Sequence, residues 1–262
     1  MKVYQTNEIK NISILGSSGS GKTTLAEAML YEGGVIKRRG SVEAGNTVSD
    51  YFPVEKEYGY SVFSTVFSVE WQDRKLNFID CPGSDDFVGA VSALNVTDTA
   101  LMVLNAQYGV EVGTINQFRY TEQFHKPVIF VVNQLDNDKA DYEGTIAQLK
   151  DRWGSKIVPI QYPISCGSSF NAVVDVLKMK MYRWKPEGGV PDVLEIPAEE
   201  MDKAMELHQA LVEAAAENDD TLMEKFFEEG ALSEDDMRAG IRAGLVTRGM
   251  FPVFCVCAGR DM

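Results

Sequence analysis

The chain has 262 residues, of which 45% are hydrophobic, so it can bury a sizeable core as one large domain or as one domain with an insertion. Its formal net charge of −14 argues against a broad binding surface for the phosphate backbone of DNA or RNA. The N-terminus lacks an apolar signal core, and no apolar run approaches the ~20 residues that cross a bilayer. We therefore expect a soluble cytoplasmic protein with neither DNA nor a membrane as a partner.

The first part of the chain alternates strand and helix patterns. Residues 11–15 form a short β-branched run, and residues 22–30 have helical spacing. Residues 33–60 are Gly-rich, polar and aperiodic, which predicts a long loop. Residues 61–71 alternate with period two and residues 75–80 return, which predicts a hairpin.

Two almost wholly apolar runs follow, as expected of strands that are covered on both faces. They occupy residues 99–106 and 126–134, with a helix-like segment between them and another helix at 141–153. This alternation predicts an α/β fold with a doubly wound sheet.

The composition changes near residue 157. From there two strand-like stretches precede a helical region in which Asp192 to Asp236 holds sixteen acidic residues and two Lys or Arg. Residues 251–259 look like a core strand again. We therefore predict a core of residues 1–157 plus 251–262, with residues 158–250 inserted into it. Because the chain stops where the next helix of such a fold should begin, we expect a fragment of a longer protein.

The stretch GSSGSGKT at residues 16–23 fits the phosphate-binding pattern G-x-x-x-x-G-K-[ST], with a strand before it and a helix after it. Backbone N–H groups and the helix N-terminus would bind the β-phosphate, and Lys22 would reach the β- and γ-phosphates. The alternative is a Gly/Ser-rich turn capped by Thr. The predicted phosphate-binding residues are Gly16, Ser17, Ser18, Gly19, Ser20, Gly21, Lys22, Thr23 and Thr24.

A second motif, DCPG, ends the strand of residues 75–80. An acid at a strand end, followed by a tight turn, is typical of a site that senses Mg²⁺ and a terminal phosphate. Asp80 and the hydroxyl of Thr23 would therefore serve the metal, and Gly83 the phosphate. The next residue, Ser84, is a poor group for steering the attacking water.

The base is selected by NQLD at residues 133–136, because a phosphate loop alone serves ATPases, kinases and GTPases equally. Asp136 can accept two hydrogen bonds from guanine, whereas adenine has no matching donors. Asn133 would hold the loop by side-chain hydrogen bonds. On its own this motif could be a simple Asx turn, but it follows the other two motifs in order.

With these motifs the sequence resembles the translational GTPases, and specifically elongation factor G. Residues 173–184 and 196–228 resemble the extra subdomain inserted in that factor's GTP-binding domain. The resemblance implies a ribosome-associated GTPase switch that binds GTP or GDP with Mg²⁺, and it implies that Cys257, Ala258 and Gly259 form the last base-contacting loop. It also implies that the tRNA-mimicking domains of the full factor are absent from this chain.

Several departures from the family pattern cluster at the γ-phosphate. Ser84 replaces the His that positions water, Ser61 replaces the Mg²⁺-binding Thr, and Gly19 replaces a loop Asp. Losing a water-positioning group costs roughly 10²–10⁴-fold in rate, or about 3–5 kcal/mol of barrier. We expect neither Ser84 nor the neighbouring Asp85 to substitute well.

A further departure lies in the base motif, where Gln134 replaces a Lys. We expect it to weaken guanine-nucleotide affinity while Asp136 keeps the specificity. The two histidines of the chain, His125 and His208, are surface or packing residues by position.

The sequence therefore favours a GTP-binding switch with slow or absent hydrolysis, whose catalytic positions would be Ser84 and Lys22. A non-hydrolysing ribosome-binding module and a P-loop kinase or ATPase remain alternatives. The acidic insertion is either a solvated helical face or, as the resemblance implies, a docking surface for the basic face of the ribosomal stalk protein. The four cysteines form no C-x-x-C pair and are expected to be reduced, buried thiols.

Overall fold

The computed structural model describes residues 2–84, 89–185 and 189–262. The chain divides into two compact units. The first comprises residues up to 105, residues 110–126 and residue 261. The second comprises residues 106–109, residues 127–260 and residue 262.

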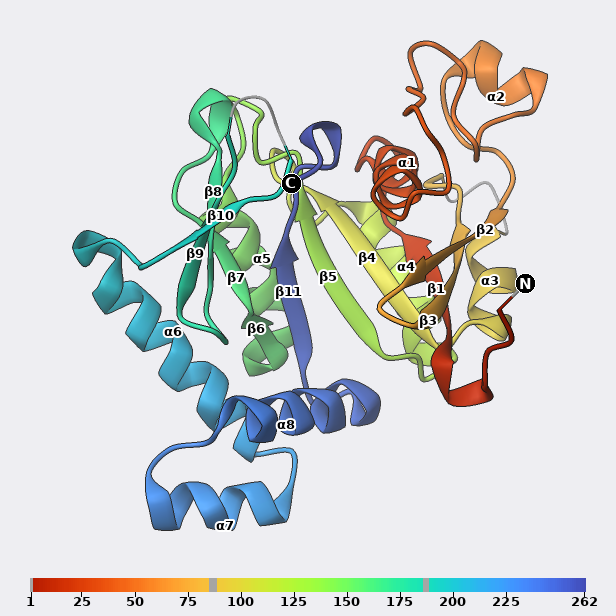
Figure 1. The fold of residues 1–262 in the computed structure, drawn as a ribbon. Coiled ribbons are helices and arrows are strands. Elements are labelled where there is room, and N and C mark those ends of the chain that lie inside the picture. Colours follow the sequence, from red (N-terminus) through yellow and green to blue (C-terminus); the bar gives the residue numbers. More distant parts are fainter. Residues whose placement is uncertain (1, 85–88, 186–188) are drawn as a thin grey trace. The chain divides into compact units, whose positions relative to one another are not determined.

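The first unit holds strands in the order β2-β3-β1-β4 (Figure 1). Strand β1 runs parallel to both β3 and β4, and β2 pairs antiparallel with β3 as the predicted hairpin. Its strands are β1 (Ile9–Leu15), β2 (Thr65–Trp71), β3 (Arg74–Asp80) and β4 (Thr99–Asn105).

The helices of this unit pack on those strands. In α4 the buried residues Thr114, Gln117, Phe118 and Thr121 recur at helical spacing, so one side of the helix faces the strands. Helix α1 contacts β2 and β3, α3 packs on β1, and α4 packs on β4. The helices are α1 (Lys22–Glu32), α2 (Pro53–Tyr58), α3 (Gly89–Val96) and α4 (Val112–Gln123), after a 3-10 turn η1 (Thr6–Glu8).

The second unit contains parallel strands in the order β5-β11-β6 and a separate antiparallel sheet in the order β10-β9-β8-β7. The parallel strands are β5 (Val128–Asn133), β6 (Ile157–Pro159) and β11 (Phe251–Cys255). The antiparallel strands are β7 (Gln161–Pro163), β8 (Ala172–Asp175), β9 (Lys180–Arg183) and β10 (Asp192–Leu194).

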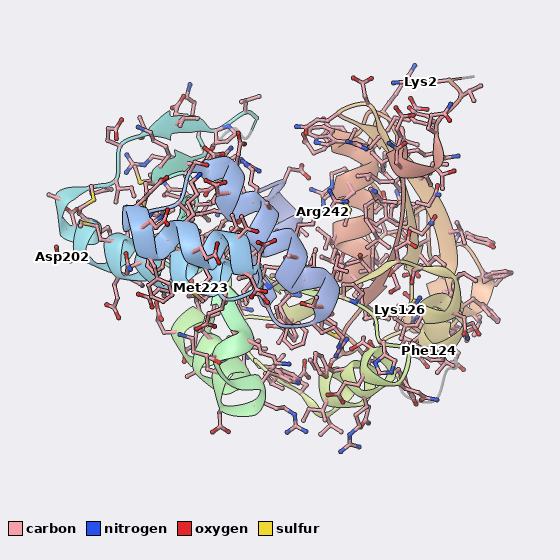
Figure 2. All side chains as sticks on the ribbon, turned by 90° about the horizontal axis from the view of Figure 1, so that it is seen from below. Lys2, Phe124, Lys126, Asp202, Met223 and Arg242 are labelled. Atoms are coloured by element: carbon pink, nitrogen blue, oxygen red, sulfur yellow. The ribbon has the colours of Figure 1, made fainter. Side chains whose placement is uncertain are left out.

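The described part of this unit includes the helices α5 to α8, and the last three form the acidic region (Figure 1). These three bury a small apolar cluster among themselves, which includes Val212, Leu222 and Met237. Figure 2 shows them from below, with Asp202 of α6, Met223 of α7 and Arg242 of α8 labelled. The helices are α5 (Tyr142–Trp153), α6 (Ala198–Ala216), α7 (Asp220–Glu229) and α8 (Glu234–Thr247), and the 3-10 turns are η2 (Gly154–Lys156), η3 (Gly167–Ser169) and η4 (Ala258–Arg260).

The predicted α/β fold class is confirmed, since parallel strands covered by helices are present in both units. One local prediction is wrong. Residues 33–60 are not wholly loop, because they contain the short helix α2. Pro53 is its first residue, the Glu55 carboxylate accepts from the Phe52 N–H at 3.1 Å, and Gly59 ends the helix in the left-handed region at φ +71°. A six-residue helix is too short to show helical periodicity in the sequence.

Three of the four cysteines are buried and Cys166 is half-buried, and all four are free thiols. Within the described residues, no helix is both long and apolar enough to cross a bilayer.

The crossing of α6 and α8 depends on a glycine. A Cβ at Gly240 would lie 2.4 Å from the backbone oxygen of Ala215 on α6. We predict that Gly240→Val lowers the free energy of unfolding by about 1–3 kcal/mol, because the helices must separate to admit the side chain. Urea unfolding followed by circular dichroism measures this loss.

The matched control is Ala239→Val on the exposed side of the same helix. Ala239→Val costs about 0.5 kcal/mol of helix propensity without a collision, whereas Gly240→Val has no propensity cost because glycine is a poorer helix former than valine. Equal destabilisation by the two substitutions would contradict the close-contact account.

Candidate functional site

The phosphate-binding loop joins β1 to α1 in the first unit. Three of its glycines have positive φ: Gly16 at +138°, Gly19 at +78° and Gly21 at +88°. At Gly16 a Cβ would also lie 2.1 Å from the backbone oxygen of Val103 on β4, so no larger residue fits. The loop therefore brings its backbone close to the strands and presents the N-terminus of α1, a favourable place for an anion.

The Lys22 side chain lies against the backbone of this loop. Its ammonium donates hydrogen bonds of 2.9 Å to the backbone oxygens of Gly16 and Ser17, and the residue is only 5% exposed. Burial lowers the pKa of Lys22, and the nearby Asp80 carboxylate opposes that shift. A buried cation is thus held at the loop, where anionic phosphate would stabilise it.

The three predicted metal residues come together from three separate segments. The register of β1 and β3 sets Asp80 opposite Ile14, two residues before the loop begins. The hydroxyl of Thr23 donates to Asp80 Oδ2 at 3.1 Å, and its oxygen lies 3.1 Å from the hydroxyl oxygen of Ser61. These oxygens are ligands of the kind that Mg²⁺ prefers.

Asp80 is incompletely satisfied in this arrangement. It is 1% exposed, and its Oδ1 atom has no well-formed hydrogen bond from the described residues, although the nearby Ser49 hydroxyl favours the charged form. Burial raises the pKa of Asp80 to about 6, although the Lys22 charge opposes the shift. A buried carboxylate oxygen without a well-formed hydrogen bond is costly, and a divalent cation would remove that cost. The residues present therefore fit Mg²⁺.

Asp50 is a member of this cluster that the sequence analysis missed. It is 5% exposed, and its Oδ1 atom also has no hydrogen-bond partner in the described part of the chain. Burial raises the pKa of Asp50, and hydrogen bonds with Ser61 and Thr23 oppose the shift. Asp50 lies in the aperiodic stretch 33–60, where no strand or helix pattern indicated its position.

Two buried glutamates hold the segment that carries Ser61. Glu27 of α1 accepts from the backbone N–H groups of Gly40, at 2.8 Å, and Val48. Glu55 of α2 accepts from the N–H groups of Val62 and Phe63, each at 3.0 Å. Glu27 therefore ties residues 40–48 to α1, and Glu55 ties α2 to the residues that follow Ser61.

The DCPG turn lies against the phosphate loop. A Cβ at Gly83 would be 2.5 Å from both the Lys22 ammonium and the backbone nitrogen of Ser18, so only glycine fits there. Ser84 follows and is half-buried. Asp85, considered above as a substitute for the missing His, lies outside the described residues.

The predicted base-binding residues lie together in the second unit. Asn133 ends β5, and Cys257 lies two residues past the end of its parallel neighbour β11. Asn133 is 1% exposed, and its Oδ1 atom accepts from the Ala258 N–H at 3.0 Å, which ties the NQLD turn to the loop at 257–259. Gln134 takes a left-handed backbone at φ +61°.

Cys257 is placed beside the acid that would read the base. Burial, followed by a hydrogen bond with the Asp136 carboxylate, raises the pKa of the Cys257 thiol to about 12. The thiol therefore stays protonated and can donate to Asp136, which is itself half-buried. Asp136 and Asn133 thus both contact the loop that carries Cys257.

The two histidines are remote from the phosphate loop or engaged elsewhere. His125 lies just past the C-terminal end of α4, whose N-terminal Thr114 contacts Ser17; twelve helical residues span about 18 Å. Nδ1 of His208 on α6 lies 2.7 Å from the backbone oxygen of Val176. The described residues contain no cluster of three or more His, Cys, Asp or Glu suited to a metal.

Comparison with known proteins agrees with this geometry. Residues 7–258 match the family described as the elongation factor Tu GTP binding domain. The chain is also similar to the crystal structure of ttk003000868 from Thermus thermophilus, with a TM-score of 0.91 and 31% sequence identity. The match covers 97% of this chain and 38% of the Thermus chain, so this chain spans well under half the length of that relative. The chain belongs to the family of the elongation factor Tu GTP-binding domain.

Proposed function

We propose that this chain is the GTP-binding switch domain of an elongation factor G-like translation factor that acts on the ribosome in the cytoplasm. The observation that carries the proposal is the cluster of Thr23, Ser61 and Asp80 beside the phosphate loop, with one buried Asp80 oxygen that has no well-formed hydrogen bond from the described residues. This cluster suits Mg²⁺ bound to a nucleoside triphosphate.

In this proposal each motif has one role. The loop from Gly16 to Thr24 binds the phosphates, and Lys22 neutralises their charge. Asp136 reads guanine, Asn133 and Cys257 hold the base loops in place, and Gln134, Ala258 and Gly259 complete the base site. Bound Mg²⁺ would supply charge neutralisation between the β- and γ-phosphates.

The same proposal includes impaired hydrolysis. Ser84 is too short to hold water against the γ-phosphate and cannot stabilise positive charge as a His can. Gly19 and Ser61 are two further departures at the same end of the nucleotide. The second candidate function, a ribosome-binding module that does not hydrolyse GTP, is favoured by the same Ser84, and a P-loop kinase or ATPase remains a weaker alternative.

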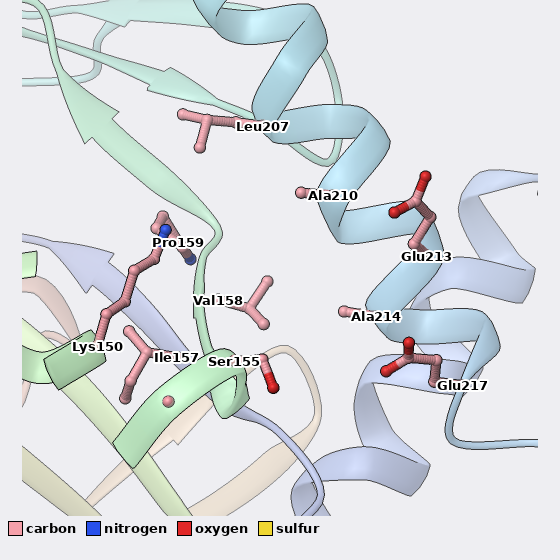
Figure 3. A pocket seen from close by; sticks show the side chains of 11 residues that line it. Lys150, Ser155, Ile157, Val158, Pro159, Leu207, Ala210, Glu213, Ala214 and Glu217 are labelled. Carbon is pink, nitrogen blue, oxygen red and sulfur yellow. The ribbon is translucent and has the colours of Figure 1, made fainter. Parts of the chain in front are cut away.

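We also propose that residues 158–250 form a subdomain of the elongation factor G type, inserted in the sequence between residues 1–157 and 251–262 of the core. Support for a docking role comes from a hollow of about 410 Å³ beside α6 (Figure 3). Two carboxylates, Glu213 and Glu217, lie on its α6 side, and Lys150 of α5 lines the opposite side. An apolar hollow with acidic neighbours suits a basic, partly apolar surface such as that of the ribosomal stalk protein. Its apolar lining consists of Ile157, Val158, Pro159, Leu207, Ala210 and Ala214.

Guanine recognition is tested by Asp136→Ala. Two charge-assisted hydrogen bonds to the base would be lost, so we expect GTP affinity to fall by about 100-fold or more while ATP binding stays weak and unchanged. Competition against fluorescent GTP in excess Mg²⁺ measures both affinities.

The control is Asp138→Ala in the same turn, whose carboxylate accepts from the Ser168 N–H at 3.1 Å and has no proposed contact with the base. If ATP displaced GTP from the unchanged chain and Asp136→Ala had no effect, the chain would be a P-loop kinase or ATPase.

Hydrolysis is tested in the full-length protein with ribosomes under single-turnover conditions. We expect slow cleavage by the natural sequence and an increase of roughly 10²–10⁴-fold in Ser84→His, because the imidazole can position water. Ser84→Ala is the control and should remain slow. A natural rate equal to that of an ordinary elongation factor G would refute the impairment.

Stalk docking is tested by reversing two charges at the hollow, Glu213→Lys with Glu217→Lys. We expect a lower association rate with purified stalk protein at low salt, and a smaller difference at high salt, since steering by exposed charge is screened. The control reverses Glu199 and Glu206 on the same helix, outside the hollow, which changes the net charge equally. If both pairs of substitutions lowered the association rate equally, the effect would come from net charge alone. That result would contradict docking at the hollow.

A further inference from the structure

Gln117 bridges the phosphate loop and the DCPG turn through its side-chain amide. It lies on the buried side of α4 and is 2% exposed. Its side-chain oxygen accepts a 2.6 Å hydrogen bond from the Gly16 N–H, and its side-chain nitrogen donates a 3.2 Å hydrogen bond to the Pro82 carbonyl oxygen. One amide therefore contacts both phosphate-sensing segments.

The contact with Pro82 also fixes the direction of the Gly83 N–H. The Pro82 carbonyl and the Gly83 N–H belong to one planar trans peptide, so the two groups point in opposite directions. Holding the carbonyl toward α4 turns the Gly83 N–H away from that helix. Gly83 itself lies close against Ser18 and Lys22 of the phosphate loop. Gln117 thus sets the direction of a backbone donor at the place where a terminal phosphate would lie.

The first turn of α4 fastens the same loop through other groups. The Thr114 N–H donates to the Ser17 hydroxyl oxygen at 3.0 Å, and the two hydroxyl oxygens are 3.2 Å apart. The Glu111 carboxylate also hydrogen-bonds with Ser17. These bonds anchor α4 to the loop and so fix the position of the Gln117 backbone. The Gln117 side chain can therefore hold the Pro82 carbonyl in one orientation.

We propose that Gln117 is a positioning residue that couples the phosphate loop to the Pro82–Gly83 peptide, so that the preference for GTP over GDP depends on it. This inference rests on the proposed function, because it assumes a nucleotide in the loop. The coupling acts on the γ-phosphate side, since the β-phosphate is bound by the loop N–H groups whatever the orientation of the Pro82–Gly83 peptide.

A purely structural role makes a different prediction. Buried amides are commonly satisfied on both sides simply to avoid unpaired polar atoms. If Gln117 only stabilised the fold, its replacement would lower the unfolding temperature and affect both nucleotides equally. The ratio of the two affinities therefore separates positioning from packing.

The main test is Gln117→Met, which keeps the length and volume but can neither accept from Gly16 nor donate to Pro82. We expect the GDP dissociation constant divided by the GTP dissociation constant to fall about tenfold. The loss of one hydrogen bond of ordinary net strength changes a dissociation constant by about that factor. The nucleotide affinities are measured by fluorescence titration of the folded chain in excess Mg²⁺. The matched control is Thr121→Val, one turn further along α4, whose hydroxyl donates at 2.7 Å to the Phe118 carbonyl within the helix.

A second variant, Gln117→Asn, covers the case in which Gln117→Met does not fold. Its amide stays neutral but is one methylene too short to reach both Gly16 and Pro82, so the affinity ratio should fall in the same direction. An unchanged ratio in either folded variant, beside a natural chain that binds GTP, would overturn the role of Gln117 alone. A natural chain that binds neither nucleotide would overturn the proposed function itself.

Discussion

The buried carboxylate of Asp80 is the constraint on which the phosphate half of the site depends. It stands at the end of β3, opposite Ile14, with one oxygen bound by Thr23 and the other without a well-formed hydrogen bond from the described residues. A protein does not bury such a group for stability, because an incompletely paired carboxylate oxygen costs free energy. Placed beside the Lys22 ammonium and the Ser61 hydroxyl, it prepares a site suited to a divalent cation with its phosphates.

Around that carboxylate, the segments next to the phosphate loop are held by side-chain contacts to backbone groups. Glu27 and Glu55 fasten the segment before β2, while Gln117 holds the turn after β3. Each of the three is almost fully buried and directs its polar atoms to backbone atoms of a neighbouring segment. A nucleotide that moves these segments must break or shift these hydrogen bonds. The three side chains can therefore influence how the segments respond to the nucleotide.

The parallel strands, the three nucleotide motifs and the acidic helices could be predicted from the sequence because each has a local signal: apolar runs, fixed spacing or charge density. Helix α2 could not, because it is too short for periodicity, and neither could the parts played by Asp50 and Gln117. Both are ordinary polar residues in sequence, and their importance arises only from burial against distant segments. Ser61 was identified from the family resemblance alone, and its 3.1 Å approach to Thr23 could not be deduced from spacing.

Calorimetric titration of the chain with GTP, first with excess Mg²⁺ and then after chelation with EDTA, shows whether the Asp80 cluster binds the metal of a guanosine triphosphate. We expect one saturable site in Mg²⁺ and a large loss of affinity without it, with Asp80→Asn behaving in Mg²⁺ as the natural chain does in EDTA. No saturable heat in Mg²⁺, or binding that is unaffected by chelation and by Asp80→Asn, would contradict metal binding by this cluster.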